Sequence, residues 1–173
     1  MKSEALHLSA DTLSAAEPKP MPASLLSPIA FLVDGIWTGR LPAGPNGSQG
    51  SIEMRFARTA SRQGIRFDSE FVQGENDVPY NSGMYGWNPA KKQIVFWYSD
   101  SDGALHEGAV TIEADLLGQE FSITAKDGRI SNARSRLTQH GADTFTNEIS
   151  LAHDGGWQKI VEVLYERGSV PKR

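Results

Sequence analysis

Over most of the chain, hydrophobic and polar residues alternate in short segments separated by turn-forming residues. In one such segment Ile52, Met54 and Phe56 fall on one face, whereas Glu53 and Arg55 fall on the other. Strict alternation of this kind is typical of a β-strand with one buried and one solvent-exposed face. The pattern therefore predicts an all-β domain.

Turn signals such as Asp-Gly and Gly-Gly divide this region into about ten segments, because these pairs allow the positive φ values that tight hairpins need. The predicted strands cover residues 36–41, 50–59, 62–73, 81–87, 92–99, 104–113, 119–126, 129–138, 143–151 and 157–167. A meander of this many strands leaves exposed edges unless it closes. We therefore predict an up-and-down antiparallel β-barrel of about 8–10 strands, with a two-sheet sandwich as the alternative.

The N-terminal region lacks the alternation. Residues 1–23 mix leucines with polar residues and end in a proline-rich stretch, which predicts a mobile N-terminal arm. A short helical segment at residues 24–33 is expected to lead into the first strand. At 173 residues the chain is the length of one domain, so residues 24–173 are expected to form a single barrel domain.

The composition narrows the function classes. A net charge of -4 without a basic cluster argues against nucleic acid as a partner. Cysteine is absent, which excludes disulfides, thiol catalysis and cysteine-bound metals. No apolar run approaches the ~20 residues that cross a bilayer, and residues 1–22 carry no signal-peptide pattern. We expect a cytoplasmic protein with no membrane partner.

Two segments, residues 94–98 and 161–165, are apolar on both faces apart from Glu162. Their outer side needs a cover, because exposed apolar patches usually mark contact sites. The candidates are the helical segment 24–33, the N-terminal arm and a second copy of the chain. A homodimer is therefore one of the expected partner states.

Aromatic residues gather in the central strands, at Phe67, Phe71, Tyr85, Trp87 and Trp97. Small barrels hold one ligand among apolar groups, with a few polar groups for orientation. We predict that these residues line a cavity on the order of hundreds of Å³ that binds a small hydrophobic or flat aromatic molecule. The alternative is that they fill a collapsed barrel.

Two polar residues are candidates for orienting such a ligand. His106 shares a strand face with Val110 and Ile112, which points it inward. An inward histidine can bind haem iron, hydrogen-bond a ligand or act as an acid or base, and otherwise it is a partnered polar residue near a hairpin end. Arg134 could reach an anionic ligand group if its face lines the cavity, and otherwise it is solvated.

Other chemistry lacks a motif. No histidine pair has a zinc spacing, no Gly-x-Ser-x-Gly occurs, and the glycine-rich loop 41–50 lacks the lysine of a phosphate loop, so we interpret it as a flap or a plain connection. No metal or cofactor is expected, and no catalytic residue is assigned. The alternative function is an isomerase, cyclase or hydratase that uses an inward histidine or carboxylate, and a third is a dimerisation module without a ligand.

Several motifs resemble one family. A short helix followed by Gly35-Ile36-Trp37 is similar to the opening of a lipocalin-type barrel. Residues 83–92, 97–103, 154–157 and 165–167 add to a resemblance, across about residues 24–167, to uncharacterised bacterial lipocalin-like (calycin-type) proteins. The resemblance implies that Arg167 of the last strand lies across Trp37 and closes one end of the barrel. The chain lacks the Thr-Asp-Tyr loop and the disulfide of secreted lipocalins, so their transport roles are not carried over.

Overall fold

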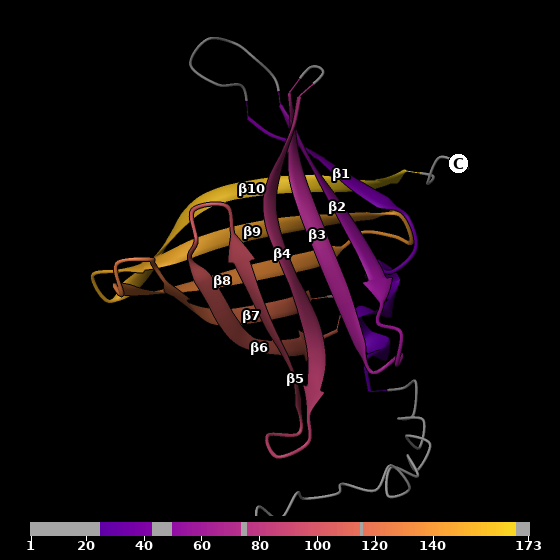
Figure 1. The fold of residues 1–173 in the computed structure, drawn as a ribbon, viewed down its shortest axis with the longest axis horizontal. Coiled ribbons are helices and arrows are strands. Elements are labelled where there is room, and N and C mark those ends of the chain that lie inside the picture. The colour runs from indigo at the N-terminus through magenta and orange to yellow at the C-terminus, as the bar shows by residue number, and fades with distance from the viewer. Residues whose placement is uncertain (1–24, 43–49, 74–75, 115, 169–173) are drawn as a thin grey trace, which may run out of the picture.

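The computed structural model describes residues 25–42, 50–73, 76–114 and 116–168. These residues form a closed antiparallel barrel in which each strand pairs with its neighbours in sequence and the first strand pairs with the last (Figure 1). The ring order is β1-β10-β9-β8-β7-β6-β5-β4-β3-β2. The predicted up-and-down barrel is therefore confirmed, and the sandwich alternative is wrong.

The strands, with the 3₁₀ helix η2 (Ser27–Leu32) before them, are β1 (Ile36–Arg40), β2 (Ser51–Arg58), β3 (Gly64–Gln73), β4 (Asn76–Asn88), β5 (Gln93–Asp100), β6 (Leu105–Glu113), β7 (Leu116–Thr124), β8 (Ile130–Gln139), β9 (Thr144–His153) and β10 (Gly156–Gly168). Most of these bounds agree with the sequence pattern within two residues. The exceptions are β4 and β7, which begin earlier than predicted.

β4 begins early because a β-bulge lets it continue past a proline. Ser69 pairs with Asn81 and Glu70 pairs with Pro79, which leaves Tyr80 as the extra residue. A proline is tolerated at a bulge, where the ladder is already interrupted. The bulge sets the inward direction of the residues that follow it on β4.

β7 begins early because the chain reverses at Ala114, whose φ is +48°. Leu117 then points inward and is buried. Burial of this leucine extends the strand through residues that otherwise have turn character. Asp115 lies outside the described residues.

The inner face of the barrel carries the core. The alternation along the strands buries the apolar members of each, among them Phe56, Ile65, Phe67, Phe96, Phe121 and Val163. Helix η2 lies over one end of the barrel, where its buried Ile29 and Leu32 join the same core cluster. We call this end, with Trp37 and Arg167, the closed end.

One of the three candidates for covering the outer side of residues 94–98, the helical segment 24–33, does not do so. Helix η2 packs against the closed end and not against the outer face of β5, where Trp97 is 48% exposed. The predicted N-terminal arm, and most of the loop at residues 41–50, lie outside the described residues. None of the helices that the structure describes is long and apolar enough to cross a membrane.

Candidate functional site

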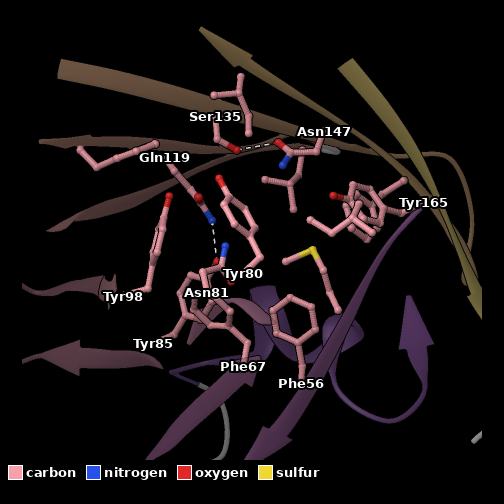
Figure 2. A pocket seen from close by; sticks show the side chains of 16 residues that line it. Phe56, Phe67, Tyr80, Asn81, Tyr85, Tyr98, Gln119, Ser135, Asn147 and Tyr165 are labelled. Carbon is pink, nitrogen blue, oxygen red and sulfur yellow. Dashed lines mark hydrogen bonds between the residues drawn. The ribbon is translucent and has the colours of Figure 1, made fainter. Parts of the chain in front are cut away.

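A cavity of about 90 Å³ lies inside the barrel, with walls from strands all around the ring (Figure 2). Its apolar lining includes Phe56, Phe67, Phe121 and Phe145, and its polar lining includes four tyrosines and three side-chain amides. The volume is smaller than the hundreds of Å³ expected from the sequence. The reason is that large aromatic side chains occupy much of the barrel interior.

Glycines on the inner face make room for these rings. Gly83 pairs with Tyr98 across β4 and β5, and Gly108 pairs with Phe121 across β6 and β7. A Cβ atom at Gly83 would lie 2.3 Å from the Cβ of Tyr98, and one at Gly108 would lie 2.5 Å from the Cβ of Phe121. Any larger residue would therefore push these two rings out of place.

The rings form one connected wall. The Phe67 ring centroid lies 5.7 Å from that of Phe56, 5.4 Å from that of Tyr85 and 5.7 Å from that of Tyr98. Tilted and edge-on aromatic pairs at these distances are favourable and rigid. The cavity thus has a fixed apolar wall on the side of β2 to β5.

Three hydrogen bonds organise the polar lining. The side-chain Nε2 of Gln119 donates to the hydroxyl of Tyr85 at 2.8 Å. The hydroxyl of Ser69 donates to the Oδ1 of Asn81 at 2.7 Å. The hydroxyl of Ser135 donates to the Oδ1 of Asn147 at 2.6 Å, which completes the set.

Other polar groups of the lining have no partner. Within the described part of the chain, the hydroxyls of Tyr80, Tyr98 and Tyr165 make no hydrogen bond, although Tyr165 is only 4% exposed. Burial raises the pKa of Tyr98 and Tyr165 well above the usual tyrosine value, and it raises the pKa of Tyr85 to about 12. These phenols are therefore neutral near pH 7 and present O–H donors to the cavity.

The closed end forms the floor of the cavity. The ring of Phe145 lines the cavity. Its centroid lies 4.8 Å from that of Trp37 and 4.8 Å from that of Tyr165, on which it stacks. Trp37 is fully buried, and its Nε1 donates to the carbonyl of Leu32 at 2.8 Å. The floor is therefore continuous with the core beneath η2.

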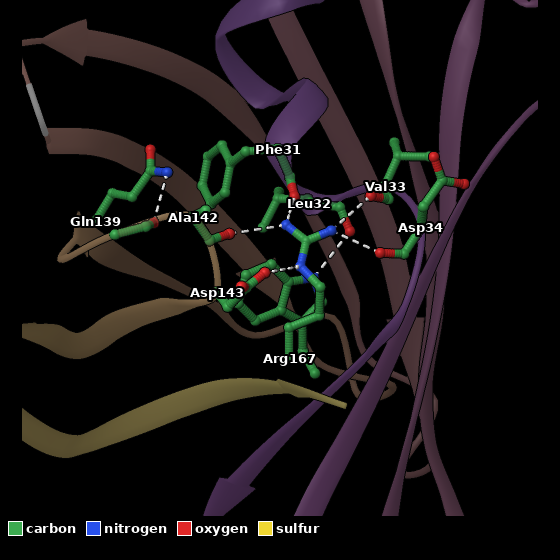
Figure 3. Close-up of polar contacts among 10 residues, drawn as sticks. Phe31, Leu32, Val33, Asp34, Gln139, Ala142, Asp143 and Arg167 are labelled. Atoms are coloured by element: carbon green, nitrogen blue, oxygen red, sulfur yellow. Dashed lines mark hydrogen bonds and ion pairs between the residues drawn. The ribbon is translucent and has the colours of Figure 1, made fainter. Parts of the chain in front are cut away.

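Arg167 connects the segments that form this end of the barrel (Figure 3). Its guanidinium carbon lies 4.4 Å from the centre of the Trp37 ring, which confirms the contact that the family resemblance implies. The guanidinium donates four hydrogen bonds, and the accepting carbonyls belong to Phe31, Val33, Asp34 and Ala142. Its Nε also forms an ion pair with Asp143 at 3.1 Å.

The backbone before β1 is shaped to receive this arginine. Gly35 has a φ of +123°, a conformation that L side chains rarely adopt. A Cβ atom there would lie 2.8 Å from the Cγ of Arg167. Both observations require glycine at this position of the Gly-x-Trp motif.

His106 points inward, as predicted, but does not line the cavity. Its ring stacks on Tyr98 with centroids 4.1 Å apart, and its Nε2 lies 2.9 Å from the Oδ2 of Asp100. Its Nδ1 is buried without a hydrogen-bond partner. Burial raises the pKa of Asp100, but hydrogen bonds from His106 and two backbone N–H groups outweigh burial and hold that pKa below its usual value. His106 is thus a partnered residue beside a hairpin, with no free nitrogen on the cavity surface.

The other predicted ligand contacts divide by strand face. Phe67 and Tyr85 line the cavity. Phe71 is half-buried and packs on Tyr80, with ring centroids 4.4 Å apart, and Trp87 is half-buried against the core. Neither Phe71 nor Trp87 is part of the cavity lining.

Trp97 and Arg134 lie on the outer face of the barrel, which is opposite to the face assigned to Trp97 and is the second of the two alternatives given for Arg134. Trp97 lies between the inward-facing residues Phe96 and Tyr98, and the guanidinium carbon of Arg134 lies 4.8 Å from the exposed ring of Trp157. The error at Trp97 arises because residues 94–98 are apolar on both faces, so the sequence pattern does not define which face is inward.

Five polar residues of the lining were not predicted, namely Asn81, Gln119, Ser135, Asn147 and Tyr165. The sequence pattern carries a signal for three of them. Gln119 occupies the inward register of β7, Ser135 lies between the inward Ala133 and Leu137 of β8, and Asn147 lies between Phe145 and Ile149 of β9. A polar residue in an otherwise apolar register is a useful marker of a cavity.

Comparison with known proteins adds the fold alone. No family model and no curated protein matches the chain. The crystal structure of Rv2717c from M. tuberculosis is similar, with a TM-score of 0.55 and 13% sequence identity over 84% of this chain and 98% of that chain. The closed antiparallel barrel fits a calycin-like fold. Among the residues described, no three histidine, aspartate or glutamate side chains gather in a way that could hold a metal ion.

Proposed function

We propose that this protein binds a small, compact molecule with a hydrophobic or flat aromatic body inside the barrel. The observation that carries the proposal is the set of unpartnered hydroxyls of Tyr98 and Tyr165 inside a cavity walled by aromatic rings. Tyr98 is half-buried and Tyr165 is buried, and their hydroxyls face the cavity space, where a polar group that loses its water partners without replacement costs about 1–3 kcal/mol. A core built only for stability would gain from phenylalanine at both positions, whereas a binding site uses the hydroxyls to orient a ligand.

The size and charge of the cavity limit the ligand. A volume of about 90 Å³ lies below the usual range of pockets for drug-sized molecules, roughly 300–1,000 Å³, which favours a molecule of few heavy atoms. No acidic or basic side chain is among the described residues that line it. An ion would lose its hydration there without a counter-charge, which favours an uncharged ligand.

Binding is favoured over the alternative of catalysis. An isomerase, cyclase or hydratase would need an acid or base in contact with its substrate. The nearest inward candidate, His106, is separated from the cavity by the ring of Tyr98 and is hydrogen-bonded to Asp100. No observation on the described residues supports a reacting group at the cavity.

The proposal is tested with fluorobenzene as a probe, observed by fluorine NMR. We expect line broadening with the wild-type protein and with Trp97→Ala, since Trp97 lies on the outer face. We expect none with Ile149→Phe or Leu137→Phe, which add volume to the cavity lining. Circular dichroism checks the fold of each variant. Equal broadening in the wild-type protein and a folded cavity-filled variant would contradict the proposal.

A further inference from the structure

Two matching serine–asparagine pairs lie on opposite walls of the cavity. Ser69 of β3 donates to Asn81 of β4, and Ser135 of β8 donates to Asn147 of β9. In the ring order of the barrel, β4 and β9 are separated by the same number of steps in both directions. Asn81 and Asn147 therefore line one cavity from strands on opposite sides of the ring.

Each serine fixes the orientation of its amide. Ser69 and Ser135 are 4% and 3% exposed, and each gives its hydroxyl hydrogen to an asparagine Oδ1. The oxygen of each amide is thus engaged, and within the described part of the chain neither Nδ2 has a hydrogen-bond partner. The amide groups of Asn81 and Asn147 are directed into the cavity (Figure 2).

The tyrosines add further hydrogen-bond donors to the two asparagine Nδ2 groups, so the cavity lining has more free donors than free acceptors. The Tyr85 hydroxyl accepts from Gln119, so its own hydrogen remains available. The hydroxyls of Tyr98 and Tyr165 are unpartnered as well. No carboxylate is among the described lining residues, so these donors lack a strong acceptor within the protein.

We propose that the ligand is an uncharged, compact molecule with hydrogen-bond acceptor oxygens at two opposite ends, which bind the amide groups of Asn81 and Asn147. This inference rests on the proposed binding function and adds the class of ligand to it. Ether and carbonyl oxygens fit, because they accept without donating. A molecule with ammonium or amide N–H groups at both ends is rejected, since donor would face donor.

Three six-membered rings of similar shape test this inference. They are para-dioxane, with two opposed oxygens, tetrahydropyran, with one, and cyclohexane, with none. The affinity of each probe is measured by ligand-observed NMR for the wild-type protein, Asn81→Leu and Asn147→Leu. The quantity compared is the ratio of the variant to the wild-type dissociation constant for each probe, which cancels differences in hydrophobicity among the probes.

We expect each substitution to weaken para-dioxane binding by about threefold to tenfold, the usual worth of one hydrogen bond, and to change cyclohexane binding by less than about twofold. Tetrahydropyran should lose less than para-dioxane from a single substitution, because its one oxygen can turn to the remaining amide. A similar loss for all three probes would overturn the inference and leave the binding function standing. Failure of every probe to bind the wild-type protein would overturn both.

Two further variants guard against loss of the fold. Ser69→Ala/Asn81→Leu removes the hydroxyl that Asn81→Leu leaves without its acceptor, and it should show the same selective loss of para-dioxane. Ser69→Ala alone frees the amide to turn, and it should give a smaller selective loss. If para-dioxane binds both variants as tightly as it binds the wild-type protein, the two-amide site is wrong.

Discussion

The closed end and the cavity are adjacent parts of the barrel, but they differ in whether their polar groups have hydrogen-bond partners. At the closed end, Arg167 donates to four backbone carbonyls and covers the Trp37 ring (Figure 3). In the cavity, the hydroxyls of Tyr98 and Tyr165 have no partner within the described chain. The difference indicates that the closed end holds the barrel together, whereas the cavity keeps hydrogen-bonding capacity for a ligand.

The strongest test of this contrast is Arg167→Ala, which should lower the free energy of unfolding by about 3–5 kcal/mol. The estimate combines several charge-assisted hydrogen bonds with one cation–π contact, and it is not a sum because these contacts are coupled. Arg167→Lys should recover only part of the loss, since an ammonium cannot reach all of the carbonyls. Urea unfolding measures both. A wild-type stability for Arg167→Ala would break the contrast, as would a folded variant that loses fluorobenzene binding.

Alkaline pH should act on the cavity and not on the closed end. The pKa of Tyr85 is raised from 10.0 to about 12, mainly by burial, so the folded state favours the neutral phenol. The stability this group contributes is fully present below pH 10 and is lost as the pH rises from about 10 to 12, by about 3 kcal/mol. Urea unfolding across this range measures the loss, and Tyr85→Phe should reduce the slope. An unchanged stability up to pH 12 would contradict the burial of a neutral phenol.

Within the cavity, two tyrosines should respond differently to loss of the hydroxyl. Tyr85→Phe leaves the Nε2 of Gln119 without its acceptor and should lower the stability by about 1–2 kcal/mol. Tyr98→Phe removes a hydroxyl that has no partner, so the stability should stay constant or rise by about 1 kcal/mol. Thermal unfolding compares the pair. Equal destabilisation by both substitutions would show that the Tyr98 hydroxyl is satisfied within the protein.

The smallest effect is expected on the outer face. Trp97→Ser should change the free energy of unfolding by less than about 0.5 kcal/mol and leave ligand affinity unchanged, because the side chain is 48% exposed and outside the cavity. The homodimer expected from the sequence as one partner state would use such exposed apolar side chains, so sedimentation of the same variant tests it. A dimeric wild-type protein and a monomeric Trp97→Ser would support that proposal, whereas identical sedimentation would exclude this face as the interface.

The sequence predicts the barrel better than it predicts the cavity. Alternation and turn residues define all of the strands, because one buried face imposes a period of two residues along the chain. The contact between Trp37 and Arg167 follows from the family resemblance, since the motifs lie in the first and last strands. At these places local chemistry and fold agree.

The cavity lining depends on information that the pattern lacks. Residues 94–98 are apolar throughout, so Trp97 and Tyr98 are equally good candidates until the hairpin register selects Tyr98. The bulge at Tyr80 sets the direction of Asn81, and a single-residue shift in phase reverses every side chain. Gln119 and Asn147 fall in the inward register of their strands, but the pattern does not tell whether an inward polar residue lines a cavity or is paired within the core.

The central claim is that the unpartnered donors of the cavity receive a ligand. A crystal structure of the protein soaked in para-dioxane tests it most directly. The account predicts one ring inside the barrel, with one oxygen within hydrogen-bonding distance of the Nδ2 of Asn81 and the other within reach of the Nδ2 of Asn147. A cavity that stays filled with water, or a ring bound only on the outer face, would contradict it.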